Sequence, residues 1–219
     1  MTRHGPVEIE AYVLGAYATN CYLLRSADDA TVPPVIVDCG ESPGALLDAA
    51  EACEAPPAVI VLTHAHLDHI AGVFNARSRF PDTPIWIHEA EERWLTDARL
   101  NLSFMTGIEV TAPPADRLLT DGETIELAGV SWEVRHTPGH SPGSISIYSA
   151  EAGVVLAGDA LFNGSIGRTD FPGSDFETLE RSIQGRLYDL PDDTVVYPGH
   201  GPDTTIGREK QCNPFVKAV

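Results

Sequence analysis

Residues 64–69 contain three histidines and one aspartate, directly after the apolar run 58–62. Imidazole nitrogens and carboxylate oxygens are the ligands that suit a borderline divalent metal such as zinc. A buried strand that ends in such a cluster would hold several ligands at the mouth of a sheet, where a substrate can reach them. The alternative is a polar surface loop, which would require three of the eight histidines to fall together by chance.

Three further residues of ligand type follow apolar strands or glycine turns elsewhere in the chain. His140 follows Pro138-Gly139, Asp159 follows the run 154–158, and His200 follows the run 195–199. Strand ends that are distant in sequence can converge in space, so the combined set predicts two adjacent metal ions. The seven candidates are His64, His66, Asp68, His69, His140, Asp159 and His200. Each alone could be a capping or core residue, and the prediction depends on their joint occurrence.

The elements that must position these residues are indicated by hydrophobic periodicity and turn residues. Strands are expected at 7–13, 20–24, 35–37, 58–62, 85–87, 124–127, 130–135, 144–148, 154–156 and 194–197. Helices are expected at 43–53, from 68 or 69 to about 80, and at 91–97, 175–187 and 208–213. Because no linker separates the halves, we expect one two-sheet domain with outer helices over residues 1–219. The irregular stretch 89–114 either lies over the site or packs in the core.

Composition narrows the function further. The 219-residue chain carries a net charge of −18, which disfavours nucleic acid and anionic membranes as partners, although solubility alone also accounts for it. No apolar run is as long as a membrane-spanning helix, and the N-terminus lacks the apolar core of a secretion signal. The four cysteines form no C-x-x-C pair and suit reduced thiols. We therefore expect a cytoplasmic protein.

These motifs together resemble the metallo-β-lactamase superfamily, and within it the short glyoxalase II-like (hydroxyacylglutathione hydrolase-like) hydrolases. The resemblance rests on H-x-H-x-D-H at 64–69, on His140, Asp159 and His200, and on Asp38 in the turn after 35–37. The segments 165–172, 199–207 and 213–215 resemble the short bacterial members. The resemblance covers essentially the whole chain. It implies an α/β (α+β) fold, an αββα sandwich of two mixed β-sheets flanked by helices, with the metals at one edge of the sheets.

The resemblance also implies a role for each site residue. His64, His66 and His140 would bind a first metal, Asp68, His69 and His200 a second, and Asp159 would bridge both. Asp38 would hold the metal loop in place without being a ligand. The cofactors would be two divalent metal ions, with zinc expected and iron or manganese as alternatives. Three other histidines, His4, His88 and His136, are not expected to be ligands.

Arg168 has two interpretations. It could hold the region of Asp170 and Asp159 by ion pairing, or it could meet an anionic substrate. Its place inside the turn sequence 165–172 favours the structural role.

The implied chemistry is thioester hydrolysis. Two metals about 3.5–4 Å apart can share a water and make it hydroxide at neutral pH. That hydroxide would attack the substrate carbonyl, and Asp68, besides being a ligand, could accept its proton. A thiolate leaves readily because the thiol pKa is about 8.5. The expected substrate is therefore a small-molecule thioester, possibly glutathione-derived, such as S-lactoylglutathione.

Several competing functions remain. Full-length glyoxalase II enzymes carry a further C-terminal helical region that grips glutathione, and this sequence ends at Val219, so broader thioester hydrolysis is an alternative. An iron-dependent persulfide dioxygenase shares the Gly-Arg-Thr-Asp-Phe sequence of 167–171 but does not usually carry Gly201-Pro202 after the last histidine. A β-lactamase is disfavoured because it would need an export signal and a different bridging pattern. The charge disfavours a nucleic-acid hydrolase, and the intact ligand set disfavours a non-catalytic binding module. The sequence is silent on oligomeric state.

Overall fold

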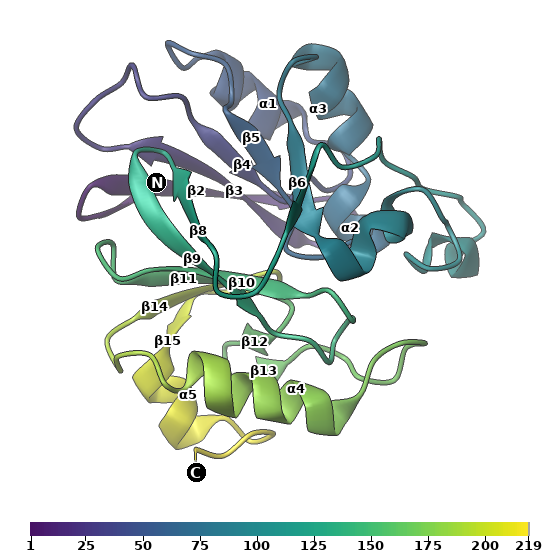
Figure 1. Cartoon of the computed structure of the whole chain (residues 1–219), viewed down its shortest axis with the longest axis vertical. Helices are drawn as coiled ribbons and strands as arrows, with labels where there is room; N and C mark the ends of the chain where they lie inside the picture. The colour runs from purple at the N-terminus through teal and green to yellow at the C-terminus, as the bar shows by residue number, and fades with distance from the viewer. Residues whose placement is uncertain (219) are drawn as a thin grey trace.

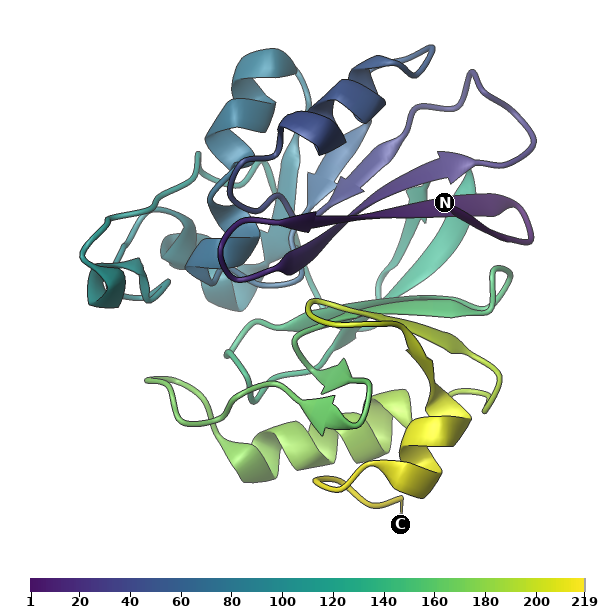
Figure 2. The ribbon, with the colours of Figure 1, turned by 180° about the vertical axis from the view of Figure 1, so that it is seen from behind.

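Two β-sheets packed face to face form the centre of the computed structural model, which describes residues 1–218 (Figure 1). The last residue of the expected domain, Val219, lies outside the described residues. The first sheet contains Thr2–His4 (β1), Val7–Leu14 (β2), Thr19–Ser26 (β3), Val35–Val37 (β4), Val59–Val61 (β5), Ile85–His88 (β6) and Arg117–Leu119 (β7), in that spatial order. The second contains Thr124–Leu127 (β8), Val130–His136 (β9), Ile145–Ser149 (β10), Val154–Gly158 (β11), Val195–Pro198 (β14) and Thr204–Thr205 (β15). A small two-stranded sheet pairs Leu161–Phe162 (β12) with Ser165–Ile166 (β13). It lies beside the helix that begins at Phe176, below the second sheet (Figure 2).

Both large sheets are mixed. Strands β1 to β4 pair antiparallel, and β4 to β7 then continue in parallel. In the second sheet β15-β14-β11-β10-β9-β8 are neighbours in that order, and only β11 and β14 run parallel.

Helices cover the outer face of each sheet. The α-helices are Gly44–Glu51 (α1), Leu67–Ile70 (α2), Val73–Arg79 (α3), Phe176–Ser182 (α4) and Ile206–Cys212 (α5). Two 3₁₀ segments, Glu89–Leu95 (η1) and Ser103–Thr106 (η2), and one π-helical segment, Ile183–Leu187 (η3), complete the set. In Figure 1, α1 and α3 lie above the first sheet, and α4 and α5 lie below the second. This layering confirms the predicted αββα fold class.

The central strands β4, β5 and β11 are apolar throughout because both of their faces are buried. Along β4, Val35 and Val37 face the core between the sheets, whereas Ile36 faces the helices. Along β11, Val154 and Leu156 face the inter-sheet core, and Val155 packs under α4 and α5. The alternation produces three apolar layers, and it explains why these runs showed no polar face in the sequence.

The predicted helix from residue 68 or 69 to about residue 80 is wrong as a single helix. It is divided into α2 and α3 at Gly72, whose N–H donates to the Cys39 carbonyl oxygen at 2.8 Å. A Cβ atom on this glycine would lie 2.2 Å from the Gly40 carbonyl oxygen. The chain therefore breaks there so that the metal-motif segment can lie directly against the turn after β4.

Other departures from the predicted elements are small. The helix expected at 91–97 is the 3₁₀ segment η1, and the helix expected at 175–187 changes to π-helical geometry at η3. The short strands β1, β7, β12, β13 and β15 were not predicted. Among residues 1–218, no helix has the length and apolar character needed to cross a membrane.

Candidate metal centre

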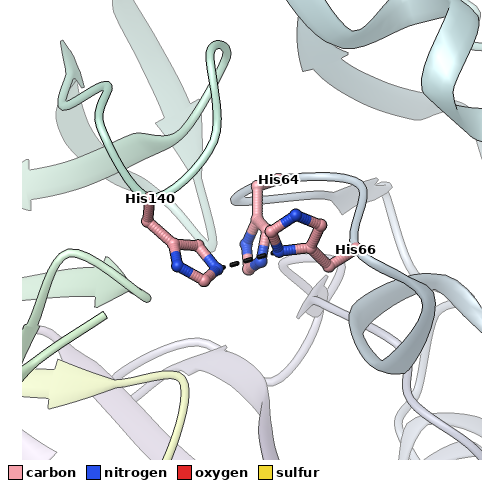
Figure 3. Close-up of side chains that lie close together, drawn as sticks. All are labelled: His64, His66 and His140. Atoms are coloured by element: carbon pink, nitrogen blue, oxygen red, sulfur yellow. Dashed lines mark hydrogen bonds between the residues drawn. The ribbon is translucent and has the colours of Figure 1, made fainter. Parts of the chain in front are cut away.

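The seven predicted ligands converge at one edge of the two sheets. His64, His66 and His140 form one group, whose candidate ligand atoms lie within 4.8 Å of one another (Figure 3). Two further groups meet the same limit: His64, His69 and Asp159, and Asp68, His69 and His200. Shared members make this one continuous cluster, contributed by segments that follow β5, β9, β11 and β14.

Unpartnered buried atoms indicate that the cluster is built for a metal. Within residues 1–218, Nε2 of His64, His66 and His69 and Oδ1 of Asp159 are buried without a hydrogen-bond partner. A buried polar atom without a partner costs about 1–3 kcal/mol, so four in one place need an explanation. Imidazole nitrogens and a carboxylate oxygen that point at one another satisfy this requirement by coordinating a divalent cation. The donor set therefore fits the group that the sequence implies.

Asp159 lies at the centre of the cluster. Its Oδ1 is 3.4 Å from His69 Nε2, and its Oδ2 is 3.4 Å from His140 Nε2 and 3.5 Å from His200 Nε2. One carboxylate thus faces histidines of both expected metal groups, which is the placement that a bridging ligand requires.

Asp68 occupies the side of the cluster nearest His200. Its Oδ2 is 3.2 Å from His200 Nε2 and accepts a hydrogen bond from Thr19 Oγ1 at 2.7 Å. Asp68 also lines the cavity that opens onto the cluster.

The charges of the cluster divide its histidines into two types. Burial lowers the pKa of His64 well below its usual value and lowers the pKa of His66 to about 3, so both are neutral and available as ligands. Burial also acts to lower the pKa of His69 and of His200, but the neighbouring carboxylates outweigh it. The pKa of His69 is raised well above its ordinary value, and that of His200 is raised to about 10. Metal binding at this second group must therefore displace protons.

Asp38 holds the loop that carries the motif. It follows β4 in a left-handed conformation with φ of 58°, a strained geometry for a residue other than glycine. Its carboxylate accepts hydrogen bonds from Thr63 N and Thr63 Oγ1, both at 2.8 Å, and its Oδ2 lies 2.8 Å from His69 Nδ1. A proton on His69 Nδ1 leaves Nε2 free as a metal ligand, which is the usual work of a carboxylate behind a histidine ligand.

Two glycines allow the strands to approach the bridging aspartate closely. A Cβ atom on Gly199 would lie 2.0 Å from Asp159 Oδ1, and one on Gly167 would lie 1.9 Å from the Asp159 carbonyl oxygen. No side chain fits at either position without moving Asp159, so the glycine before His200 is required by the site itself.

Arg168 lies at the rim of the site, and its side chain pairs with Asp170 through bonds of 2.9 and 2.8 Å. Within the described residues it makes no ion pair with Asp159, so that part of the expected pairing is wrong. Its backbone carbonyl instead accepts from His140 Nδ1 at 2.8 Å, which orients that ring. The guanidinium also stacks over Phe171, with its central carbon 4.2 Å from the ring centre.

The three histidines not expected to be ligands lie outside the cluster. His136 Nε2 bonds to the Pro142 carbonyl at 2.8 Å, and its ring stacks on His88 with centres 4.1 Å apart. His4 Nε2 lies 2.6 Å from the hydroxyl of Tyr197.

A cavity of about 320 Å³ opens onto the cluster. Five of the seven candidate ligands line it, namely His66, Asp68, His140, Asp159 and His200, and the rest of its lining is mostly apolar or aromatic. The apolar and aromatic part includes Tyr17, Leu102, Met105, Phe162 and Phe171, and Arg168 is the one arginine or lysine in the lining. A larger hollow of about 550 Å³ lies around Arg25 and Asp28 and contains none of the clustered histidines, so the smaller cavity is the substrate site we infer.

Several residues that support the cluster were not predicted. Asn20 Nδ2 donates to the carbonyl oxygens of Pro198 and Gly201 at 2.9 and 2.8 Å, and so fixes the turn that carries His200. The buried Glu91 accepts hydrogen bonds from Ala65 N and Gly143 N, in the two segments that carry His64, His66 and His140. The only sequence signal for Glu91 is its spacing of three residues from the buried Trp94, which places both on the inner face of a 3₁₀ segment.

Comparison with known sequences agrees with the geometry. A sequence model of the metallo-beta-lactamase superfamily matches residues 14–200. A probable metallo-hydrolase of Bacillus subtilis, YqgX, is 47% identical over 161 residues, which cover 73% of this chain and 76% of the relative. The hydroxyacylglutathione hydrolase GloC of Haemophilus influenzae is 35% identical over 218 residues and covers 97% of this chain and 99% of its own length.

Solved structures give the same result. The BLEG-1 B3 metallo-beta-lactamase superposes with a TM-score of 0.89 and 42% identity, covering 95% of this chain and 99% of its own. TTHA1623, solved in a di-iron-bound form, superposes with a TM-score of 0.79 and 37% identity, covering 94% of this chain and 100% of its own. ETHE1 from Myxococcus xanthus superposes with a TM-score of 0.76 and 26% identity, covering 94% of this chain and 83% of its own. The match over most of the chain shows both the family and the fold, and the histidine–aspartate cluster of such a fold suggests a dinuclear metal site.

Proposed function

The chain belongs to the metallo-β-lactamase superfamily, and from this premise we propose that it is a thioester hydrolase of glyoxalase II type. The proposed substrate class is the S-(2-hydroxyacyl)glutathiones, with S-lactoylglutathione as the test compound. The superfamily supports a metallo-hydrolase, and the relative named hydroxyacylglutathione hydrolase supports the finer proposal. The observation that carries it is a cluster with four unpartnered buried ligand atoms, of which two residues, His66 and Asp159, also line a mostly apolar cavity.

The proposed ligand sets are those of the sequence prediction. His64, His66 and His140 would hold one metal ion, and Asp68, His69 and His200 would hold the other, with Asp159 shared. We propose zinc, with iron as the alternative because TTHA1623 was solved with two irons. When bound, such a metal pair lowers the pKa of a water and polarises a carbonyl group.

The chain's own residues would position the substrate and move the proton. Asp68 Oδ2, held by the Thr19 hydroxyl at 2.7 Å, would accept the proton of the attacking water. Leu102 and Phe171 would bind the apolar parts of the thioester and exclude bulk water from the carbonyl. The thiolate needs little acid help to leave, because the pKa of its thiol is about 8.5.

The proposal also covers cellular setting and partners. We propose a cytoplasmic protein, supported by four free cysteines, two of them buried. The net charge of −18 supports a small-molecule partner and not nucleic acid or an anionic membrane. We further propose that residues 1–219 fold as one domain.

A persulfide dioxygenase is the second candidate, because ETHE1 from Myxococcus xanthus shares the fold over 94% of this chain. One experiment separates the two. Metal content per chain is measured, and S-lactoylglutathione hydrolysis is then compared with oxygen uptake in the presence of glutathione persulfide. We expect close to two metals and thioester hydrolysis. A single iron with persulfide-dependent oxygen uptake would refute the hydrolase.

Two controls complete the test. Asp159→Ala should abolish activity and lower metal content, and unchanged metal content would show that the shared ligand is misplaced. A β-lactam belongs among the test compounds because the similar protein BLEG-1 is a B3 metallo-beta-lactamase. Cleavage of the β-lactam but not of the thioester would also reject the proposal.

A further inference from the structure

Glu91 is a fully buried carboxylate that lies beside the metal cluster without belonging to it. It is on η1, between two exposed glutamates, Glu89 and Glu92. Its Oε2 accepts a hydrogen bond from Ala65 N at 2.6 Å. Its Oε1 accepts from Gly143 N at 2.7 Å and from the Ser141 hydroxyl. Both oxygens are therefore used, and each contacts a different segment of the chain.

The two segments are those that carry the three histidines of the first metal group. Ala65 lies between His64 and His66, at the end of β5 in the first sheet. Ser141 directly follows His140, after β9 in the second sheet. A single side chain on a third element thus connects the two halves of the three-histidine group by hydrogen bonds from backbone and side chain.

The packing around Glu91 leaves it little freedom. A Cβ atom on Gly143 would lie 2.8 Å from Glu91 Cγ and 3.1 Å from its Cβ, so the loop after His140 lies directly against the glutamate. The Ser141 hydroxyl also bonds to Ser144 Oγ at 2.7 Å. Any movement of the carboxylate would therefore be transmitted to both ligand segments.

We propose that Glu91 is a positioning residue for the first metal ion, acting through the backbone on His64, His66 and His140. It is the counterpart of Asp38, whose Oδ2 lies 2.8 Å from Nδ1 of His69 in the second metal group. Each half of the centre thus has its own buried carboxylate. This inference rests on the proposed metal site, and it adds a residue that contacts neither metal nor substrate.

A role limited to general stability makes a different prediction from a positioning role. A generally destabilised protein would bind both metals more weakly, whereas loss of a positioning residue weakens one site selectively. The test therefore uses two backgrounds with one site each. His200→Ala retains the three-histidine group, and His140→Ala retains the group of Asp68, His69 and His200.

Glu91→Gln is introduced into both backgrounds, and zinc affinity is measured by competition with a chromophoric chelator. The glutamine is similar in size, but its amide group must face the N–H of either Ala65 or Gly143, and one bond is lost. We expect zinc affinity to fall by about 10–100-fold in the His200→Ala background, as for other supporting residues behind metal ligands. In the His140→Ala background we expect a change within about twofold, because Glu91 bonds to Ala65, Ser141 and Gly143 and to none of Asp68, His69 and His200.

Glu89→Gln is the matched control, because this neighbouring glutamate on the same 3₁₀ segment is exposed. It should leave zinc affinity unchanged in both backgrounds. If Glu91→Gln fails to fold, Ser141→Ala removes one donor to the carboxylate and should weaken the same site by a smaller factor.

Equal weakening in both backgrounds, or no weakening in either, would overturn the role of Glu91. A wild-type protein that binds no zinc or other divalent metal would instead reject the metal centre of the proposed function. The two failures are therefore distinct.

Discussion

Gly199→Ala should remove metal from the centre while leaving the fold intact. The new Cβ atom would lie 2.0 Å from Asp159 Oδ1 and 2.9 Å from His69 Cε1. Retreat of the backbone is opposed, because Gly199 N donates to the Gly158 carbonyl at 2.8 Å and Asn20 N donates to the Gly199 carbonyl at 2.7 Å. The Asp159 carboxylate must therefore move.

The size of the movement sets the size of the effect. A contact of 3.0 Å is about the shortest that a Cβ atom makes, so the carboxylate must shift by about 1 Å. Metal–ligand distances tolerate only about 0.2 Å, so Asp159 would cease to be a shared ligand. A misplacement of about 1 Å in a reacting site costs about 10²-fold in rate, or about 2.7 kcal/mol of transition-state stabilisation. Stability of the metal-free protein should change by no more than about 1 kcal/mol, since the end of a side chain can yield and alanine restricts the unfolded chain.

The assay compares metal content, kcat/KM for the thioester and urea unfolding of the metal-free protein. Gly185→Ala is the matched control, because no atom lies within 4 Å of its new Cβ and its φ is not positive. The control should keep both metals and full activity and gain about 0.4–1 kcal/mol of stability. A Gly199→Ala protein with wild-type metal content and activity would show that Asp159 does not occupy a shared metal position.

Three further perturbations test the remaining parts of the site. Arg168→Ala should change the free energy of unfolding by less than about 1 kcal/mol, because the ion pair of Arg168 with Asp170 is exposed. The metal content should not change. A tenfold rise in KM for the thioester would instead assign the arginine to substrate binding. In the metal-free protein, the stabilisation that comes from the raised pKa of His200 is complete below about pH 6.5 and is lost as the pH rises through about 10. The free energy of unfolding in urea should therefore be lower at pH 10.5 than at pH 7. His200→Ala should remove much of this difference. Zinc at 100 times its dissociation constant should raise the free energy of unfolding by about 2.7 kcal/mol over the chelated protein, and thermal unfolding that does not depend on zinc would contradict a bound metal.

The ligand residues were accessible from the sequence because they follow short apolar strands or, for His140, a glycine turn. His64, Asp159 and His200 come at the ends of runs that are buried on both faces, and that pattern is local. The fold class followed from the same runs together with the family resemblance. The local sequence pattern gave the type of each candidate ligand and its position near the end of a strand. These two features are the ones on which the predicted metal site depends.

The supporting residues were not accessible because their contacts join segments that are distant in sequence. Glu91 lies 26 residues from Ala65 and 52 residues from Gly143, and it has acidic neighbours that are exposed. Asn20 is 178 residues from the Pro198 carbonyl that it binds. Nothing in the local sequence distinguishes such residues from surface polar residues, since their role depends on which segments of the chain the fold brings together.

The irregular stretch after β6 shows why a local reading left two possibilities open. Its first part packs in the core, with Trp94 and Leu95 buried. Its second part lines the cavity through Leu102 and Met105, and Leu102 has a left-handed φ of 69°. The side-chain amide of Asn101 holds this turn by bonding to the Trp94 and Val110 carbonyl oxygens. Both interpretations are therefore correct, each for a different half of the segment.

The position of the centre between the sheets has a structural consequence. His64, His66, Asp68 and His69 come from the first sheet, whereas His140, Asp159 and His200 come from the second. Few backbone bonds join the sheets at this edge, among them Ile145 N to the Thr63 carbonyl at 2.9 Å. Since each metal would take ligands from both sheets, bound metal links them where the substrate cavity opens. The cavity walls are carried by the same two halves, so metal occupancy and cavity shape are coupled by the fold.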